Sequence, residues 1–183
     1  MAQLSRDRSF LMVIDLQERL LPAIHDHQAV RDRSVFLIRA ARILGLPIVW
    51  TEQYRKGLGP TVPPVAEAIG DAARPMEKMA FGCLCDDAVA RAVESAGRDQ
   101  LILCGIEAHV CVLQTALAAR ERGLTVFLAE DAIGSRRPSD RDAALRRMAQ
   151  AGCVPATSEM LVMEALRVAG TDPFKQLLPL LKG

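Results

Sequence analysis

The sequence predicts an α/β domain, in which helices cover both faces of a three-layer, doubly wound and mostly parallel sheet of Rossmann-like topology. Short aliphatic runs of strand length alternate along the chain with amphipathic stretches of helical period. A glycine follows most of the helical stretches, shortly before the next aliphatic run. This alternation is typical of parallel strands joined by right-handed crossovers. The 183 residues fit one domain, which we expect to span 1–183.

The strand-length runs consist mainly of β-branched and aliphatic residues, which is typical of strands that are buried on both faces. The most apolar of them, SFLMVI, lies near the N-terminus. The predicted strands are residues 9–14, 47–51, 100–104, 124–129 and a shorter one at 153–156.

The predicted helices place apolar side chains on one stripe, so that one face of each helix covers the sheet. They span residues 28–44, 86–96, 110–122, 139–151 and 159–168. Ser139 with Asp142 resembles a capping pair, and Thr157 or Ser158 is suited to cap the helix that follows. The C-terminal stretch TDPFKQLLPLLKG predicts a further short apolar helix, which could dock on its own domain or on a neighbouring subunit.

The segment from 52 to 79 breaks the alternation of strands and helices. It is rich in residues that interrupt regular structure, namely Gly57, Gly59, Pro60, Pro63 and Pro64. An irregular connection of this length is typical of a binding loop or a lid.

Charge and cysteine content restrict the classes of function. The 23 basic and 22 acidic side chains nearly cancel, which argues against nucleic acid or a membrane surface as partner and favours a small-molecule substrate. The apolar run at 10–14 is too short for a signal-peptide core or a membrane span, so we expect a cytoplasmic protein. Five cysteines at irregular spacing fit a reducing compartment, and Cys83 with Cys85 lacks the second ligand pair of a zinc site.

Functional groups in a doubly wound fold gather at the carboxyl ends of the strands. Asp15 directly follows the first predicted strand. Cys111 lies in the first turn of the predicted helix 110–122, where free N–H groups and the helix dipole favour a thiolate. Lys78 lies in an apolar stretch after the irregular segment. From the residues alone, Asp15 could instead cap a turn, Cys111 could fill a gap in the core, and Lys78 could extend to solvent.

Several motifs together carry a family resemblance: VIDLQERLLPAI, LPIVWTEQYRKGLGPT, EKMAFGC, LCGIEAHVCVLQTALAARERG and AEDAIGSR. With them the chain resembles the isochorismatase-like cysteine hydrolase superfamily, in its small isochorismatase-domain branch, over about residues 9–168. The resemblance implies a catalytic triad of Asp15, Lys78 and Cys111. It also implies an oxyanion hole from the backbone N–H groups of Glu107 and Cys111, a cis peptide bond before Glu107, and a homo-oligomer of two or more subunits.

The chemistry suits these residue types. Asp15 is expected to take the thiol proton, Lys78 to lower the pKa of the thiol, and Cys111 to attack a carbonyl carbon and form a thioester. Backbone donors would then stabilise the negative oxygen of each tetrahedral state. The implied reaction is hydrolysis of a small amide-like C–N bond or a related acyl compound, without a cofactor.

The chain departs from two branches of the superfamily. Nicotinamidases carry metal-binding histidines after the second strand, whereas WTEQYRKGLG has none, so we predict no catalytic metal and full activity after chelation. Isochorismatases that cleave a vinyl ether tend to lack the nucleophilic cysteine, so Cys111 argues against that alternative reaction.

The candidates for substrate binding lie near the predicted strand ends: Gln17, Trp50, Gln53, Tyr54, Phe81 and His109. Trp50 could equally be a core residue. Because few charged groups apart from the triad converge here, a small neutral amide fits better than a polyanion.

Two other classes of protein compete with the hydrolase. A dinucleotide-binding enzyme requires a glycine fingerprint after the first strand, and IDLQERLLP contains no glycine. A non-catalytic or redox-sensing protein would use Cys111 as a switch, because a reactive thiolate also oxidises readily. The sequence excludes the first of these classes and leaves the second open.

Overall fold

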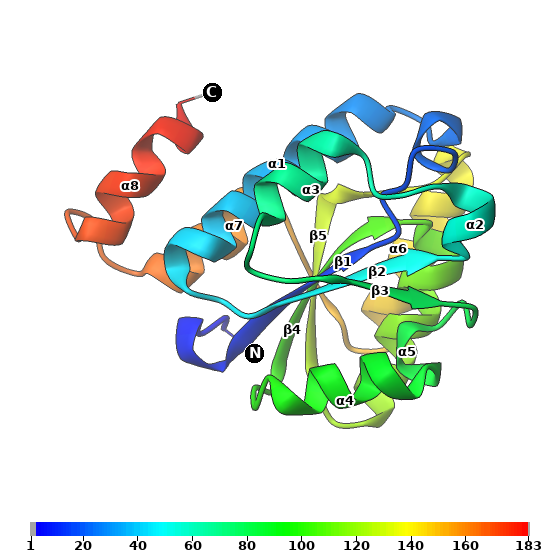
Figure 1. The fold of residues 1–183 in the computed structure, drawn as a ribbon. Helices are drawn as coiled ribbons and strands as arrows, with labels where there is room; N and C mark the ends of the chain where they lie inside the picture. The colour runs from blue at the N-terminus through cyan, green and yellow to red at the C-terminus, as the bar shows by residue number, and fades with distance from the viewer. Residues whose placement is uncertain (1–2, 183) are drawn as a thin grey trace.

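Six parallel strands form one sheet, in the order β3-β2-β1-β4-β5-β6, in the computed structural model, which describes residues 3–182 (Figure 1). The strands are β1 Ser9–Ile14, β2 Ile48–Gln53, β3 Pro75–Lys78, β4 Gln100–Ile106, β5 Thr125–Gly134 and β6 Val154–Ala156. The order reverses between β1 and β4, which makes this pair the topological switch point of a doubly wound sheet.

Helices cover both faces of the sheet (Figure 1), which confirms the predicted fold class. One face carries α1 His27–Leu44, α3 Pro63–Ile69 and α7 Ser158–Leu166, and the other carries α4 Asp87–Ser95, α5 Leu113–Glu121 and α6 Pro138–Gln150. Two further helices are α2 Arg55–Leu58 and α8 Asp172–Leu181, and short turns lie at Arg6–Arg8, Leu21–Ala23, Cys83–Cys85 and Ala108–Val112.

The central strand β1 shows why the sequence folds into three layers. All six of its residues are buried. Leu11 and Val13 belong to the core beneath α1, whereas Phe10, Met12 and Ile14 belong to the core beneath α4 and α5. Alternate side chains of a strand point to opposite faces, so a continuous apolar run supplies two cores at once.

The irregular segment 52–79 is more ordered than predicted. β2 continues to Gln53, α2 and α3 follow, and β3 closes the segment at Lys78. The prediction of one long loop was therefore wrong. Pro63 and Pro64 start α3 instead of interrupting it, because the first turn of a helix does not need the missing N–H groups. β3 is a short edge strand whose pairing with β2 defines it.

The predicted helix caps are partly correct. Thr157 caps α7, because its side chain accepts the N–H of Met160 at 3.3 Å. The pair Ser139 and Asp142 was wrong as a cap, since α6 begins at Pro138 after Arg137 and has no side-chain cap bond.

The C-terminal helix α8 docks on its own chain. Leu177 is fully buried in the same core as residues of α1 and α7, and Leu180 and Leu181 pack against that core. Figure 1 shows α8 beside α1, beyond the end of the sheet. Docking on its own domain, one of the two predicted alternatives, is therefore the arrangement observed.

Gly105 allows β4 to approach β1 closely at the switch point. Its φ is +119°, and a Cβ atom there would lie 2.1 Å from the carbonyl oxygen of Ile14 and 2.8 Å from the carbonyl carbon and the amide nitrogen of that residue. Because these atoms are backbone, they cannot move without disturbing the strand pair.

Replacing Gly105 by alanine is therefore expected to lower the free energy of unfolding by at least about 3 kcal/mol. Gly97 gives the matched control, since it also has a positive φ, but a methyl group there would meet no atom of the described chain within 4 Å beyond its own sequence neighbours. Gly97→Ala is expected to cost only about 1 kcal/mol. Urea unfolding of both variants measures the difference, and equal losses would contradict the close approach as the cause.

Candidate active site

Asp15 lies where β1 ends, and its side chain is completely buried. The residue has a positive φ of 54°, which turns the chain out of the strand. One carboxylate oxygen, Oδ1, accepts the hydroxyl of Thr51 at 2.8 Å. The other, Oδ2, accepts the ammonium of Lys78 at 2.8 Å. A buried carboxylate requires such partners, because burial without them is costly.

Lys78 is the last residue of β3 and pairs in register with Gln53 of β2. The residue is only 1% exposed, and its Nζ lies among acceptors. The ammonium donates to Asp15 at 2.8 Å and to Gln53 Oε1 at 2.7 Å. Longer contacts reach the carbonyl oxygens of Ala80 at 3.3 Å and Phe81 at 3.4 Å. Lys78 therefore does not extend to solvent, which was the alternative role for it.

Cys111 follows β4 and is 5% exposed. The prediction that Cys111 lies in the first turn of an α-helix was wrong. The residue lies in a π-helical turn at Ala108–Val112, which leads into α5. The carbonyl oxygen of Glu107, the residue before this turn, accepts the N–H groups of both Val110 and Val112. The peptide bond between Ile106 and Glu107 is cis, as predicted.

The three side chains meet at the switch point of the sheet. The Nζ of Lys78 lies 2.8 Å from Asp15 Oδ2 and 3.7 Å from Cys111 Sγ. They come from the ends of β1, β3 and the turn after β4, so distant parts of the chain build one cluster of carboxylate, ammonium and thiol.

The ionisation of Cys111 differs from the expectation. Burial first, and then the negative charge of Asp15, raise the pKa of its thiol to about 12, although the ammonium of Lys78 acts to lower it. The predicted lowering by Lys78 is present but is outweighed by burial. The resting thiol is therefore neutral near pH 7. Burial also opposes the charge on Lys78, yet the surrounding groups, with Asp15 first, raise its pKa overall.

The buried thiols make stability depend on alkaline pH. Burial raises the pKa of Cys104 and Cys111 to about 12 and that of Cys83 and Cys153 to about 11, from 9.0. Above pH 9 the unfolded chain releases these protons while the folded chain still holds them, so each thiol lowers stability by up to about 1.4 kcal/mol per pH unit.

The melting temperature is therefore expected to fall steeply from pH 9 to 11, and these thiols are expected to contribute nothing to a change below pH 8. Cys104→Ala should make the alkaline slope shallower. Cys85 is exposed and serves as the control, and its replacement by serine should leave the slope unchanged. A flat alkaline profile of the unmodified protein would contradict the burial of neutral thiols.

Two threonines that the sequence analysis did not single out support the cluster. Thr51 lies between Asp15 and Cys83, with its hydroxyl 2.8 Å from the carboxylate and 3.8 Å from the sulfur of Cys83. Thr115 donates to the carbonyl oxygen of Cys111 at 2.7 Å and accepts the N–H of Cys83 at 2.9 Å. The available signal for Thr51 was its position as the last residue of the predicted strand 47–51, where functional groups of a doubly wound fold gather.

The candidates for substrate binding divide by exposure. Gln17 is completely buried, and its amide is occupied by the backbone of Gln53 and Gly59. Trp50 belongs to the core and donates its indole N–H to Thr61 at 2.8 Å. The side chains of Gln17 and Trp50 therefore bond to other parts of the protein and support the fold.

The other candidates lie near Lys78 or at the surface. Gln53 is 8% exposed and contacts the ammonium. Tyr54 and Phe81 are 45% and 55% exposed. The N–H of Tyr54 donates to the carbonyl oxygen of Lys78, and the carbonyl oxygen of Phe81 lies 3.4 Å from the ammonium of Lys78. His109 is half-buried, with Nδ1 3.0 Å from the hydroxyl of Ser135. Tyr54, Phe81 and His109 thus keep side-chain surface that a ligand could contact.

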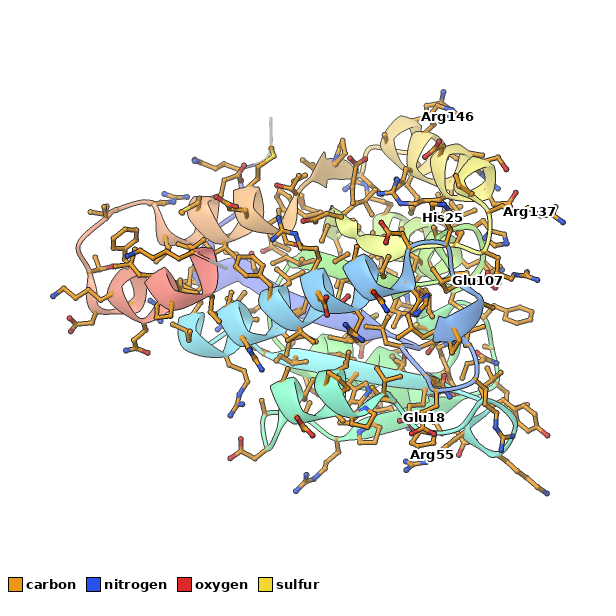
Figure 2. All side chains as sticks on the ribbon, turned by 90° about the horizontal axis from the view of Figure 1, so that it is seen from above. Glu18, His25, Arg55, Glu107, Arg137 and Arg146 are labelled. Carbon is orange, nitrogen blue, oxygen red and sulfur yellow. The ribbon has the colours of Figure 1, made fainter. Side chains whose placement is uncertain are left out.

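Charged side chains of both signs surround this end of the molecule. Figure 2 shows Glu18, Arg55, Glu107 and Arg137 at the end to which the strands point. Glu107 forms an ion pair of 2.8 Å with Arg136, and Glu52 forms one of 3.1 Å with Arg55. The rim therefore has no single sign of charge that would select a polyanion.

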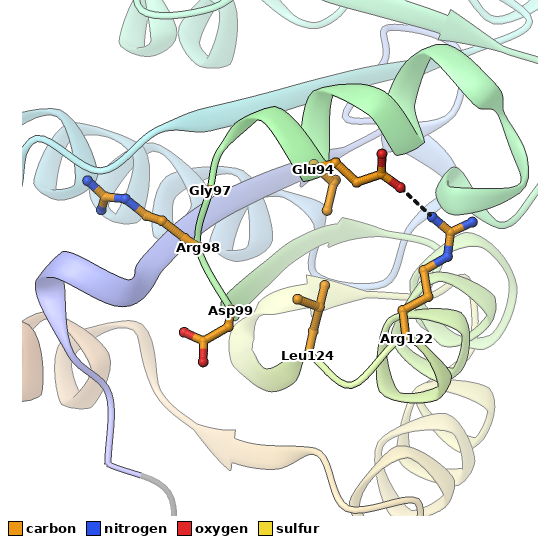
Figure 3. Close-up of a pocket in the computed structure, with 7 residues that line it drawn as sticks. Glu94, Gly97, Arg98, Asp99, Arg122 and Leu124 are labelled. Atoms are coloured by element: carbon orange, nitrogen blue, oxygen red, sulfur yellow. Dashed lines mark ion pairs between the residues drawn. The ribbon is translucent and has the colours of Figure 1, made fainter.

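A hollow of about 600 Å³ lies at the opposite end of the sheet, where β4 and β5 begin. Its lining comes from the end of α4 and the starts of β4 and β5, and an ion pair of 3.9 Å joins Glu94 to Arg122 there (Figure 3). Ligands of doubly wound sheets bind at the carboxyl ends of the strands. We therefore place the candidate site at the cluster of Asp15, Lys78 and Cys111.

Within residues 3–182, no group of three or more histidine, cysteine or acidic side chains is arranged to hold a metal ion. In the same part of the chain, no helix combines the length and the apolar composition that crossing a membrane requires.

The fold and the cluster define a class of protein, a doubly wound α/β domain with a buried carboxylate, ammonium and thiol at the switch point. The isochorismatase domain family matches residues 9–160. The chain belongs to this family of isochorismatase-like hydrolases, which confirms the predicted resemblance. Isochorismatase domain-containing protein 2A of Mus musculus is 40% identical over 179 residues, which are 96% of this chain and 84% of the relative.

Several solved structures are similar to this chain in fold and in sequence. The MAR1 ribonuclease of Caenorhabditis elegans is 37% identical with a TM-score of 0.93, over 100% of this chain and 93% of that one. Two bacterial YcaC proteins are also similar. The Escherichia coli protein, an octameric hydrolase of unknown specificity, is 26% identical with a TM-score of 0.92 over 98% of this chain and 91% of its own. The Pseudomonas aeruginosa protein, solved with hexane-2,5-diol and covalent acrylamide, is 28% identical with a TM-score of 0.90 over 97% and 91%.

Proposed function

We propose that this protein hydrolyses the C–N bond of a small neutral amide, or a related acyl bond, through a thioester on Cys111. The observation that carries the proposal is the position of Lys78 Nζ, which lies 2.8 Å from Asp15 and 3.7 Å from the sulfur of Cys111. A thiol, a base and a cation within contact distance are the groups that nucleophilic acyl transfer requires.

In the first step the sulfur of Cys111 attacks the carbonyl carbon while its proton passes to Asp15. The carbonyl π electrons move to oxygen, and a tetrahedral oxyanion forms. When the oxyanion collapses, the C–N bond breaks and the proton on Asp15 passes to the leaving nitrogen. An amine or ammonia leaves, and the acyl group remains on sulfur as a thioester.

In the second step water attacks the thioester carbonyl, and Asp15 takes a proton from that water. Collapse of the second tetrahedral state breaks the C–S bond, the carboxylic acid leaves, and the proton returns from Asp15 to sulfur. The raised pKa of Cys111 supports a coupled transfer, in which the thiol gives up its proton as the sulfur attacks.

Lys78 compensates the negative charge of Asp15 and holds the carboxylate near the sulfur of Cys111. Its ammonium neutralises Asp15 in the resting state and faces the developing negative charge on sulfur during attack. For the oxyanion we propose the backbone N–H groups of Glu107, which directly precedes the turn Ala108–Val112, and of Cys111, which lies within that turn. A helix start directs its N–H groups toward such a charge.

Two observations bear on the choice between a hydrolase and a thiolate sensor. Oxidation of a cysteine by peroxides proceeds through its thiolate, so the raised pKa of Cys111 counts against a thiolate sensor. Covalent acrylamide in the Pseudomonas aeruginosa relative supports a reactive nucleophile in that protein, since acrylamide is an electrophile. The octameric relative supports our expectation that this chain forms a homo-oligomer.

The test is a panel of small aliphatic and aromatic amides, assayed for release of acid and of ammonia or amine in equal amounts. The panel also includes a vinyl ether acid and an RNA oligonucleotide, which represent the other reactions that relatives suggest. We expect turnover of at least one amide, with no loss after chelation. Cleavage of the RNA or the vinyl ether, with every amide left intact, would contradict the proposed reaction.

A further inference from the structure

Strand β2 supports both charged members of the cluster from one of its faces. Thr51 and Gln53 are two residues apart, so their side chains point to the same face of the sheet. Thr51 donates to Asp15, and Gln53 accepts from Lys78. On the opposite face, Glu52 accepts the N–H and hydroxyl of Thr61.

The orientation of the Gln53 amide is fixed at both ends. Its Nε2 donates to the carbonyl oxygen of Met79 at 2.8 Å, and its Oε1 accepts from Lys78 at 2.7 Å. Its backbone is held as well, because Gln17 accepts the N–H of Gln53 and donates to its carbonyl oxygen. Each end of the amide therefore already has a partner within the protein.

The three N–H bonds of the Lys78 ammonium differ in how close their partners lie. Two go to short partners, Gln53 at 2.7 Å and Asp15 at 2.8 Å. The third has only long contacts, to Ala80 at 3.3 Å, Phe81 at 3.4 Å and the sulfur of Cys111 at 3.7 Å. An N–H bond without a short partner is the one available to a thiolate.

We propose that Gln53 is a positioning residue, which holds the second N–H bond of Lys78 so that the third is directed at the sulfur of Cys111. The inference rests on the proposed role of Cys111 as nucleophile. It replaces our expectation that Gln53 binds substrate. An amide suits this task because it accepts a hydrogen bond without adding a negative charge that would oppose a thiolate.

The proposal predicts how Cys111 reacts with an alkylating reagent. Gln53→Met keeps the length of the side chain and removes the acceptor, whereas Gln53→Glu keeps an acceptor and adds a negative charge. The groups near this amide that titrate are Lys78, Asp15, Cys83 and Cys111. Both variants are expected to slow the alkylation of Cys111 about tenfold, the size expected when a hydrogen bond to a charged group is lost.

Rates are measured with iodoacetamide between pH 7 and 9, by mass spectrometry of the separate cysteine peptides. Exposed Cys85 in the same molecule is the internal reference, and its rate should not change. Circular dichroism melting shows that each variant is folded at the assay temperature. Because two different substitutions are used, failure of one to fold leaves the other to test the proposal.

A second background tests whether Gln53 acts through Lys78. In a protein that carries Asp15→Asn and Lys78→Met, adding Gln53→Met is expected to change the alkylation of Cys111 less than twofold. Slowing by the same factor in both backgrounds, or no slowing in the unmodified background, would overturn the proposal. If no amide is turned over but this dependence on Lys78 holds, the proposed function fails and the positioning role stands.

Discussion

Replacing Cys111 by alanine is expected to lower amide turnover by about four to six orders of magnitude, because the covalent route disappears with the nucleophile. The alanine variant should fold, since the sulfur fills little space and its thiol is neutral in the folded state. Initial rates on the best amide of the panel, with the melting temperature measured beside them, give the result.

Two matched substitutions sharpen this prediction. Cys111→Ser keeps the shape of the site but has a much weaker nucleophile, so it should lose nearly as much activity. Cys85→Ser removes an exposed thiol from the surface and should retain full activity. Substantial turnover by Cys111→Ala would rule out the sulfur as the nucleophile, and so would equal losses in the Cys85 and Cys111 variants.

Replacing Lys78 by methionine is expected to abolish turnover and also to lower the free energy of unfolding by about 3–5 kcal/mol. The second effect arises because Asp15, which is completely buried, would lose the cation that compensates its charge. Urea unfolding measures the loss of stability, and the amide assay measures the loss of function.

The double variant Asp15→Asn and Lys78→Met separates the two effects. Neutral side chains at both positions leave no buried charge, so most of the lost stability should return. Turnover should not return, because the base and the cation are both absent. A double variant that is as unstable as Lys78→Met would contradict the buried ion pair as the cause, and a double variant that regains activity would contradict the proposed mechanism.

The fold was predictable where local sequence determines structure. The continuous apolar run of β1 has the length and composition typical of a strand buried on both faces, and its end placed Asp15 at the carboxyl ends of the strands. β3 was not predictable in this way. Its residues PMEK have no strong strand signal, and the strand exists because it pairs with β2 at the edge of the sheet.

The placement of Asp15, Lys78 and Cys111 near the strand ends was predictable from position and family motif, but their environment was not. The π-helical turn around Cys111 has no signature in the apolar periodicity, so the sequence suggested an ordinary α-helix. Burial, which decides the pKa of Cys111, is a property of the whole fold, and the sequence pointed to the opposite direction. The role of Gln53 likewise depends on β3, which brings Lys78 beside it.

Mass mapping of the acyl group during turnover tests the central claim most directly. The protein is mixed with its best amide, quenched in acid within one turnover and digested, and the mass of each cysteine peptide is measured. The proposed chemistry predicts the mass of the acyl group on the peptide that contains Cys111, and its removal by neutral hydroxylamine, which cleaves thioesters. An acyl group on a different residue of an active protein would contradict it.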